Sequence, residues 1–323
     1  MKTVLKRSGL ALLAFIATFL LIACSSQSSN TSSDSSSSST SKASQAAEVS
    51  IKGVTVPVNP KKVVTFDLGV ADTIRALGFE DSIVGLPTKN LPDYLSGLSD
   101  RKSVGSMKEP DLEAIDALQP DLIIASGRTA DYIEQFQKIA PTILFETDHA
   151  DYWNSVKSNI TTLASIYGED AVADAKKQLA NLDSQIADIA AANKKSDKKA
   201  LAMILNEGNM AINGPKSRFA FLYSTLGFHP TDAKIEESRH GQDISFEGIR
   251  EINPDLIFVL NRTLAIGGDA SRDKSLLENE LVKGTNAGQN NGIVNLTSDL
   301  WYLSGGGLES TQLMIDDVKD YAK

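Results

Sequence analysis

Three arginines stand where a strand is expected to end, which is where an α/β protein holds its ligands. Arg128 and Arg262 follow two apolar stretches that lie 134 positions apart, and Arg218 follows a third stretch and a Gly214-Pro215 turn. A guanidinium stays charged, is planar, and offers paired N–H donors that suit anionic oxygens. Taken singly, an arginine more often forms a surface ion pair. Their shared kind of location predicts a cleft for a ligand with several negative oxygens.

A second group of candidate ligand-binding residues lies in the segment Leu300–Gly307. Tyr302 offers a phenolic oxygen, which is a hard ligand for a ferric ion once it is deprotonated. Trp301 offers a ring that could pack on an aromatic ligand. Both aromatics could instead fill the core beneath the last helix, and periodicity alone favours that interpretation. The glycines do not form a phosphate-binding loop, because no Gly-Lys-Ser or Gly-Lys-Thr follows them.

The chain has three histidines. His240, in a polar loop beside Gly241, could reach into a cleft, although a loop histidine taken alone is more often exposed to solvent. His229 stands in a turn, and His149 stands before a long helical stretch. Three scattered histidines do not predict a zinc or manganese site built from protein ligands alone. The chain also lacks the signatures of metalloproteases, serine hydrolases, dithiol enzymes and dinucleotide-binding proteins, so no enzyme is predicted.

The elements that would position these residues come in two copies. Residues 112–129 read LEAIDALQPDLIIASGRT, and residues 246–263 read FEGIREINPDLIFVLNRT. Each copy is an amphipathic helix that stops before a proline, then an apolar strand, then the arginine. This pattern is common in α/β proteins, but the matched arginines favour duplication. Two facing α/β lobes bring both arginines into one cleft, because ligands bind beyond the carboxyl ends of the strands.

Alternating strands and helices predict mostly parallel sheets. Strands are expected at 49–56, 62–66, 82–85, 121–125, 142–145, 200–206, 209–213, 255–260 and 293–296, and helices at 69–77, 111–118, 130–139, 218–226, 245–252 and 307–322. Between the halves, apolar residues at helical spacing predict a helix of about seventeen residues, roughly 25 Å long, and a second at about 170–193. The first is interpreted as a stiff connection between the lobes. The alternative is that both helices pack on one lobe.

The amino terminus predicts export and a lipid anchor. Lys2, Lys6 and Arg7 precede the apolar run Leu10–Ala23, which is short for a membrane span and typical of a signal peptide. Cys24, the chain's only cysteine, follows this run directly. That position is typical of a bacterial lipoprotein, in which the cysteine becomes the acylated first residue. An ordinary signal peptide with a chance cysteine is the weaker alternative.

A serine-rich segment separates the expected anchor from the globular body. Thirteen of residues 25–47 are serine, so the segment buries too little apolar surface to fold and is expected to be a flexible tether. Such a tether suits the extracellular face of a Gram-positive type cell membrane. The net charge is −9, and it becomes −12 without the three basic residues of the signal peptide. An acidic surface argues against nucleic acid as a partner.

Together these segments resemble the siderophore-binding lipoproteins of iron ABC importers, and among them the ferric-catecholate binders of Gram-positive bacteria. The resemblance covers roughly residues 48–323. It is carried by Thr65–Gly69, Gly105–Glu113, Gly214–Phe221, Ser238–Gly241, Asn261–Thr263 and Trp301–Leu303.

The resemblance implies an α/β fold of two Rossmann-like lobes joined by a single long helix, the class III periplasmic-binding-protein fold. The implied parts are a signal peptide (1–23), a lipidated cysteine with its tether (24–47), an N-terminal lobe (48–149), a linking helix (150–168) and a C-terminal lobe (169–323). A stiff linking helix leads us to expect modest lobe movement on binding.

The resemblance also implies roles for residues. Side chains that would contact a transported Fe(III)-catecholate are Arg128, Arg218, Arg262 and Trp301, of which Arg128 lies in a loop that varies in the family. His240 and Tyr302 would complete the iron coordination when the siderophore offers only two catechols. Glu113 and Glu247, at matched positions of the repeat, would pair with arginines of a dimeric permease that works with an ATPase.

No permanently bound cofactor and no enzymatic activity are expected, and the protein is expected to be a monomer held at the membrane by lipid alone. Two alternatives remain open at this point. One is a haem-binding lipoprotein of the same fold, with His240 or Tyr302 as axial ligand. The other is a surface enzyme that acts on an anionic substrate, against which the lack of a nucleophile–base pair argues.

Overall fold

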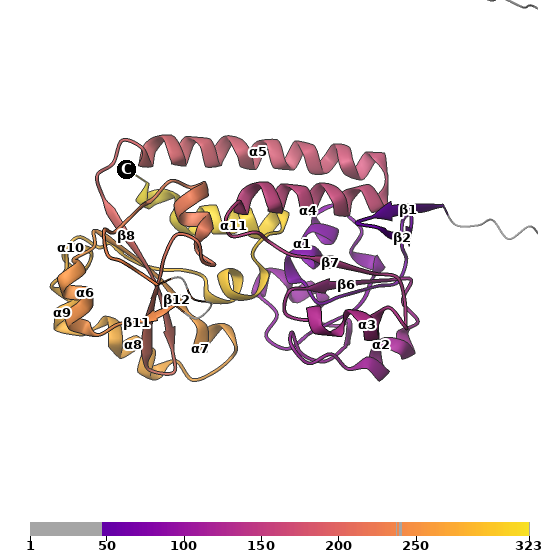
Figure 1. Ribbon diagram of the computed structural model, residues 1–323, viewed down its shortest axis with the longest axis horizontal. Helices are drawn as coiled ribbons and strands as arrows, with labels where there is room; N and C mark the ends of the chain where they lie inside the picture. The colour runs from indigo at the N-terminus through magenta and orange to yellow at the C-terminus, as the bar shows by residue number, and fades with distance from the viewer. Residues whose placement is uncertain (1–46, 237, 239–240, 323) are drawn as a thin grey trace, which may run out of the picture. The chain divides into compact units, whose positions relative to one another are not determined.

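The computed structural model describes residues 47–236, 238 and 241–322, which belong to one compact unit built on two principal sheets (Figure 1). The predicted two-lobed α/β fold is confirmed. The predicted signal peptide, Cys24, nearly all of the tether, and His240 lie outside the described residues. Within the described part of the chain, no helix combines the length and apolarity that crossing a bilayer requires.

The first lobe contains a five-stranded parallel sheet with the order β5-β4-β3-β6-β7. Its strands are β3 (Val63–Thr65), β4 (Ile83–Leu86), β5 (Lys102–Ser103), β6 (Leu122–Ser126) and β7 (Thr142–Phe145). This order of strands across the sheet is the Rossmann-like arrangement: successive strands are added on one side of β3 up to β5, and β6 then begins the other side. The carboxyl ends of β3 and β6 therefore flank the crevice where such a sheet holds a ligand.

The second lobe contains a six-stranded mixed sheet with the order β11-β9-β8-β12-β13, and β10 also pairs with β8. Its strands are β8 (Lys199–Asn206), β9 (Asn209–Asn213), β10 (His229–Pro230), β11 (Gln242–Asp243), β12 (Leu256–Asn261) and β13 (Ile293–Asn295). Strands β8, β12 and β13 are parallel, whereas β9 and β11 run antiparallel to their neighbours. The expectation of mostly parallel sheets holds for the first lobe and for the centre of the second.

The two copies of the repeat fold alike. Helices α2 (Leu112–Leu118) and α6 (Phe246–Ile252) both end at a residue with left-handed backbone, Gln119 at φ 47° and Asn253 at φ 46°. Strand β6 then pairs with β3, and β12 pairs in the same way with β8. The matched strands begin at Leu122 and Leu256, which are again 134 positions apart. This correspondence supports duplication.

Apart from the two helices that join the lobes, the other α-helices of the described residues are α1 (Leu68–Ala76), α3 (Ile133–Phe136), α7 (Arg262–Ala265), α8 (Ser271–Leu277), α9 (Glu280–Lys283), α10 (Asn286–Gln289) and α11 (Leu308–Val318). The predicted helix 218–226 is present but shorter, as the π-helix η4 (Phe221–Thr225). Residues 219–223 are all buried, so this segment lacks the exposed face of an amphipathic helix. The predicted strand 49–56 is a hairpin of β1 (Glu48–Ile51) and β2 (Val54–Pro57), because Lys52 and Gly53 take positive φ angles and reverse the chain.

Helices α4 (Tyr152–Tyr167) and α5 (Glu169–Asn193) follow the last strand of the first sheet and precede the first strand of the second. They pack against each other (Figure 1). Helix α4 occupies the predicted linking segment 150–168. Helix α5 contacts both lobes: Gln178 Nε2 donates to the carbonyl of Ala76 at 3.3 Å, and Asn193 Nδ2 donates to that of Leu226 at 2.8 Å. Because α5 touches both lobes, the boundary at residue 168 stays a prediction.

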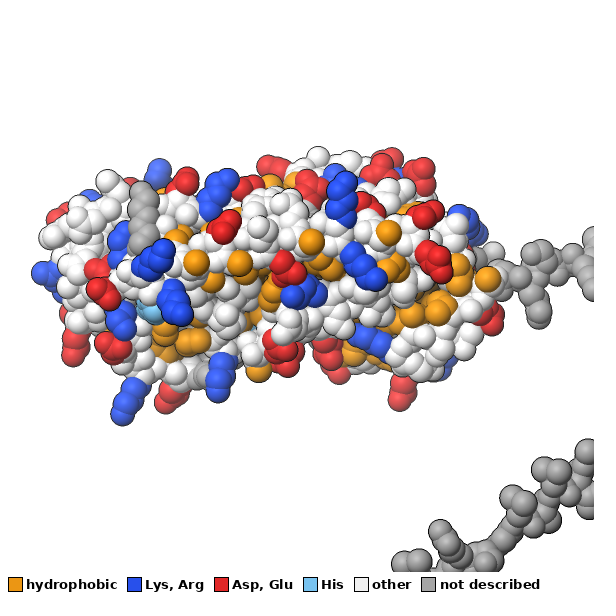
Figure 2. All heavy atoms as spheres, turned by 90° about the horizontal axis from the view of Figure 1, so that it is seen from above, with side chains coloured by type: hydrophobic (Ala, Val, Ile, Leu, Met, Phe, Trp, Pro, Cys, Tyr) orange, Lys and Arg blue, Asp and Glu red, His pale blue; other side chains and the backbone are white. Residues whose placement is uncertain are grey.

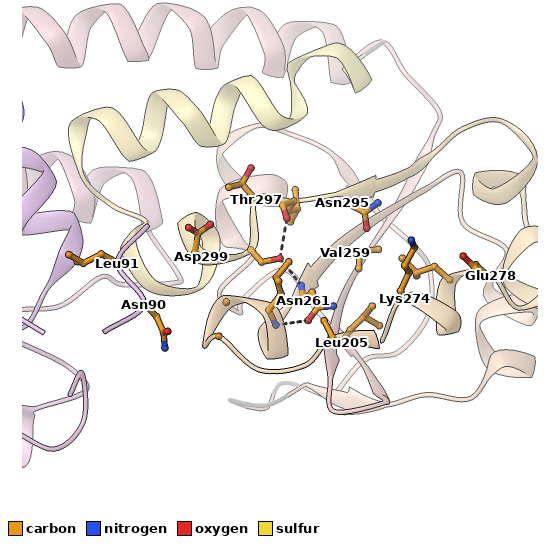
Figure 3. A pocket seen from close by; sticks show the side chains of 17 residues that line it. Asn90, Leu91, Leu205, Val259, Asn261, Lys274, Glu278, Asn295, Thr297 and Asp299 are labelled. Carbon is orange, nitrogen blue, oxygen red and sulfur yellow. Dashed lines mark hydrogen bonds between the residues drawn. The ribbon is translucent and has the colours of Figure 1, made fainter. Parts of the chain in front are cut away.

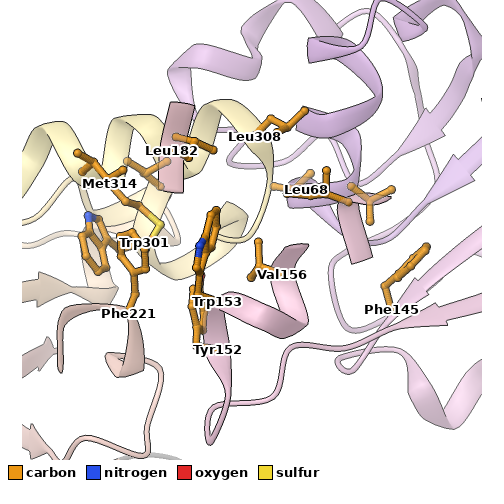
Figure 4. Packing of buried hydrophobic residues seen from close by; sticks show 14 of the residues in the cluster. Leu68, Phe145, Tyr152, Trp153, Val156, Leu182, Phe221, Trp301, Leu308 and Met314 are labelled. Atoms are coloured by element: carbon orange, nitrogen blue, oxygen red, sulfur yellow. The ribbon is translucent and has the colours of Figure 1, made fainter. Parts of the chain in front are cut away.

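One large hydrophobic cluster extends through both lobes and the helices that join them (Figure 4). Trp153 and Val156 of α4, Leu182 of α5 and Met314 of α11 belong to it. Two smaller clusters lie on the other faces of the two sheets. A core shared by the lobes resists their separation, because opening it exposes apolar surface to water.

Candidate ligand-binding site

The three predicted arginines converge on the ring of Tyr302. The guanidinium carbon lies 4.5 Å from the ring centroid for Arg218, 5.1 Å for Arg128 and 5.7 Å for Arg262. Arg128 belongs to the first lobe and the other two arginines belong to the second. The structure therefore brings four of the predicted site residues together from both lobes.

Two of these arginines follow the carboxyl ends of strands, and hydrogen bonds fix their side chains. Arg262 directly follows β12, and its Nε donates to the hydroxyl of Tyr302 at 2.9 Å, while Nη1 donates to Oδ1 of Asn206, the last residue of β8. Arg128 follows β6, and its Nη2 donates to the backbone carbonyl of Tyr302 at 2.6 Å. Arg218 lies in the turn between β9 and η4. Each guanidinium thus reaches Tyr302 from a different segment of the chain.

The surroundings of Tyr302 favour its phenolate form. Partial burial acts to raise the pKa of Tyr302, but the hydrogen bond from Arg262 and the charges of Arg218, Arg262 and Arg128 outweigh it. The pKa of Tyr302 therefore lies below its ordinary value of 10.0. A phenolate is a hard anionic oxygen, which is the kind of ligand that Fe(III) prefers.

A cavity of about 660 Å³ is lined by Tyr302, Arg128 and Arg218. On the first lobe its wall consists mainly of residues 66–67, 126–128, 145–147 and 149, which come at or just after the carboxyl ends of β3, β6 and β7. On the second lobe it consists mainly of residues 216–218 and 301–303. The cavity thus lies at the reversal point of the Rossmann-like sheet, where a ligand is expected.

Among the cavity-lining residues that sequence reasoning did not select as site residues are Asp67, His149 and Lys216. Asp67 caps α1, where its Oδ1 accepts from the amide of Val70, and burial raises its pKa despite backbone hydrogen bonds and the charge of Arg128. Partial burial and then the charge of Arg218 lower the pKa of His149. Asp67 and His149 both follow predicted strands closely, so the rule that selected the arginines could have found them.

Trp301 lines the cavity but lies mostly within the core. Its side chain is 7% exposed, its Nε1 donates to Oδ2 of Asp317 at 2.8 Å, and its ring lies 6.1 Å from that of Phe221. Figure 4 shows it among the buried side chains near Met314. The predicted contact between Trp301 and a ligand stays a prediction.

The described residues contain no group of three or more His, Cys, Asp or Glu side chains that could hold a metal ion. The predicted ligand His240 cannot be placed, because it lies outside the described residues.

A larger cavity of about 850 Å³ lies elsewhere in the second lobe, with Asn90 and Leu91 of the first lobe also lining it (Figure 3). Its wall is mostly apolar and contains Lys274, but none of the three arginines. Glu278 and Asp299 also line it. This balance of charge does not suit a ligand with several negative oxygens, so volume alone does not identify the site.

Glu113 and Glu247 occupy the first turns of α2 and α6, and both are exposed. Their equivalent places agree with the repeat, while the predicted docking role stays a prediction. On the face turned to the viewer in Figure 2, basic and acidic side chains are interspersed. That face therefore shows no single-sign patch of the kind that binds a polyanion.

Comparison with known proteins identifies the class. The profile of the periplasmic binding protein family matches residues 63–300, and the chain belongs to this family. It is 42% identical over 319 residues to the petrobactin-binding protein of Bacillus subtilis, covering 98% of this chain and 99% of that protein. It is 30% identical over 274 residues to the ferric-anguibactin-binding protein of Vibrio anguillarum, covering 82% and 84%.

Solved structures agree. The substrate-binding protein of an iron-uptake ABC transporter from Streptococcus pneumoniae matches with a TM-score of 0.81 at 60% identity, covering 82% of this chain and 94% of that one. The periplasmic catecholate-siderophore-binding protein of Vibrio cholerae matches with a TM-score of 0.78 at 30% identity, covering 85% and 99%. The resemblance to siderophore-binding proteins of iron importers is thereby confirmed.

Proposed function

We propose that this protein captures ferric catecholate siderophores of the bis-catechol type outside the cell and delivers them to an ABC import permease. The observation that carries the proposal is the set of three guanidiniums around Tyr302. Relatives whose names record binding of petrobactin and of catecholate siderophores support it.

The chemistry of the ligand fits this arrangement. A ferric bis-catecholate is anionic, and guanidiniums in a partly desolvated cleft offset its charge and donate to its oxygens. Two catechols leave coordination positions open on the metal. The phenolate of Tyr302 fills one of them with a hard oxygen, and His240 is proposed for another.

Delivery requires an anchor and a docking surface. We assign the anchor to acylated Cys24 and the tether that follows it. Glu113 and Glu247, one on each lobe, are assigned to docking on the two halves of the permease. In this arrangement the protein holds no permanent cofactor, and the iron is cargo.

A binding screen tests the proposal. Tryptophan fluorescence is titrated with ferric bis-catecholate, ferric tris-catecholate, ferric hydroxamate and haem, for wild type, Tyr302→Phe and the control Tyr321→Phe. Tyr321 lies in the last turn of the chain and does not line the cavity. We expect a broad visible charge-transfer band with the bis-catecholate, and a loss of roughly tenfold or more for Tyr302→Phe with this ligand. The loss with the tris-catecholate is expected to be much smaller.

Two outcomes would contradict the proposal. Equal losses for both catecholates in Tyr302→Phe would exclude direct coordination by the phenolate. A Soret shift with haem, without binding of any ferric catecholate, would favour a haem-binding protein instead.

A further inference from the structure

The segment that carries Tyr302 is docked on helix α1 of the first lobe, backbone against backbone. It continues into the glycine turn, residues 305–307, which leads into α11. A Cβ atom at Gly69 of α1 would lie 2.9 Å from the carbonyl oxygen of Gly305 and 3.1 Å from the amide nitrogen of Gly307. A Cβ atom at Gly307 would lie 2.5 Å from the carbonyl oxygen of Gly69. The two segments approach so closely because neither has a side chain there.

One buried carboxylate joins the two segments. Asp72 of α1 is fully buried, and its Oδ1 accepts from the amide of Glu309 at 3.1 Å while its Oδ2 accepts from the amide of Ser310 at 2.7 Å. Ser310 Oγ in turn accepts from the amide of Gly307 at 2.9 Å. A carboxylate from the first lobe therefore caps the first turn of α11 in the second, where free amides and the helix dipole favour a negative charge.

Burial and a neighbouring like charge make the ionised form of Asp72 unfavourable at this contact between α1 and α11. Burial raises the pKa of Asp72 to about 6, despite its hydrogen bonds to Ser310 and Glu309. Glu309 adds a like charge but is paired with Arg75, and the buried hydroxyl of Tyr94 also faces the cluster. At neutral pH the carboxylate is ionised in a place where ionisation is unfavourable. Such strained sites commonly serve function rather than stability.

The glycine turn links this junction to the ligand site. Helix α1 directly follows Asp67, which lines the cavity, and the glycine turn directly follows η5 (Leu300–Ser304), which contains Tyr302. The bond from Arg128 to the carbonyl of Tyr302 holds the same segment from its other side. The bonds of Asp72 thus belong to the contacts that fix the position of the phenol relative to the first lobe, together with the bond of Arg128 and the packing of Gly69 on the glycine turn.

We infer that Asp72 is a positioning residue for Tyr302: it anchors the start of α11 to α1 and so fixes the phenol of the second lobe against the cavity wall of the first. The inference deepens the proposed function and rests on it for the role of Tyr302 in binding. Asp72 itself does not line the cavity, so it acts on the ligand through Tyr302.

The test compares Asp72→Asn with Asp121→Asn in the full chain. Asp121 is a matched control because its carboxylate also accepts two backbone amides, those of Lys61 at 2.8 Å and Lys62 at 3.0 Å, within the first lobe and away from the cavity. In each variant the pKa of Tyr302 is measured by absorbance difference against the same variant with Tyr302→Phe. We expect Asp72→Asn to move the pKa of Tyr302 toward 10.0 and Asp121→Asn to leave it unchanged.

Affinity gives the second readout. Asp72→Asn is expected to weaken ferric bis-catecholate binding by about tenfold, the scale seen when a group that orients a metal ligand is removed. The tris-catecholate, which does not need the phenolate, is expected to lose much less. If Asp72→Asn changes neither the pKa of Tyr302 nor the bis-catecholate affinity beyond the change in Asp121→Asn, Asp72 has a structural role alone and the inference is wrong.

A further variant keeps the test decisive if Asp72→Asn does not fold. Gly69→Ala displaces the glycine turn by a few tenths of an ångström without removing the carboxylate, and Gly97→Ala, whose Cβ meets nothing within 4 Å, is its control. The same two readouts apply, with the same expected ranking. If wild type binds no ferric catecholate, the proposed function fails, while the titration of Tyr302 still decides whether Asp72 positions the phenol.

Discussion

The pKa of Tyr302 offers a direct test of the arginine cluster that needs no ligand. We predict that Arg262→Met raises this pKa more than Arg128→Met does. Methionine keeps the apolar stem of arginine but removes both its charge and its donors. Arg262 loses a hydrogen bond to the phenol itself, whereas Arg128 donates to the backbone carbonyl and acts on the phenol through its charge alone.

The expected size follows from the contacts. A hydrogen bond to a charged group contributes roughly 1.5–3 kcal/mol, and one pKa unit corresponds to about 1.4 kcal/mol. Because Tyr302 is only partly buried, solvent screening favours the lower end of this range. We therefore expect Arg262→Met to remove about 1.5 kcal/mol of phenolate stabilisation, and so to raise the pKa of Tyr302 clearly more than Arg128→Met does.

The assay is a spectrophotometric titration of phenolate absorbance from neutral to alkaline pH. The chain has seven tyrosines, so the curve of Tyr302→Phe is subtracted to isolate one of them. Burial helps, because it raises the pKa of four others, which therefore ionise late: Tyr94, Tyr152, Tyr167 and Tyr223. Arg250→Met, an exposed arginine on α6, serves as the charge control.

Two results would refute the reasoning. If the step that Tyr302→Phe removes lies at or above the ordinary tyrosine value of 10.0, the pKa of Tyr302 is not lowered. If Arg262→Met shifts the step no further than Arg250→Met does, the guanidinium does not bond the phenol in solution. Either result would remove the observation on which the proposed function stands.

Three further predictions concern the scaffold and the docking surface. Gly307→Ala places a methyl group against the buried carboxylate of Asp72 and the backbone carbonyl of Gly69. It should cost about 2 kcal/mol and lower Tm by roughly 4–8 °C, whereas Gly97→Ala should melt close to wild type in the same calorimetric scan. The pKa of Asp72 is raised from 3.8 to about 6 on folding, so the stabilising effect of its bound proton is complete below about pH 4 and is lost as the pH rises through about 6. Denaturant unfolding of wild type and Asp72→Asn measures this effect. From about pH 4 to about pH 6 the free energy of unfolding of wild type relative to Asp72→Asn should fall by up to about 3 kcal/mol, and above about pH 6 it should stay constant. A difference that does not change with pH would contradict the assignment. Replacing Glu113 and Glu247 together by alanine should abolish cellular uptake of the ferric catecholate while leaving its affinity for the isolated protein unchanged; a parallel loss of affinity would argue against docking.

Sequence reasoning succeeded where local pattern and sheet geometry act together. Arg128 and Arg262 could be selected because each directly follows an apolar strand, and parallel strands end at a common edge. The same rule would have found Asp67 and His149 had it not been restricted to arginine. Periodicity located α1, α2, α6 and α11 to within a few residues, since each presents one apolar face to a sheet or to another helix.

Sequence reasoning failed where tertiary contacts decide. Helices α9 and α10 have four residues each, too short for periodicity to detect, and they start at the capping side chains of Asn279 and Thr285. The role of Asp72 was equally hidden, because the amides that it accepts belong to residues 237 and 238 positions further along the chain. No local pattern reports a bond of that range.

The cross-lobe contacts also bear on how the cleft works. Besides the bonds of Asp72 and Arg128, Asn90 Nδ2 of the first lobe donates to the carbonyl of Ile266 in the second at 2.8 Å. A wide opening of the lobes would break these bonds, each worth about 1 kcal/mol, and would also divide the shared apolar cluster. The closed arrangement is therefore the populated state of the free protein, and the ligand does not have to supply free energy to close the cleft. We therefore expect the site to be largely formed before binding, so that differences in affinity between ferric ligands report their coordination to Tyr302 and their contacts with the arginines, and not the work of closing the cleft.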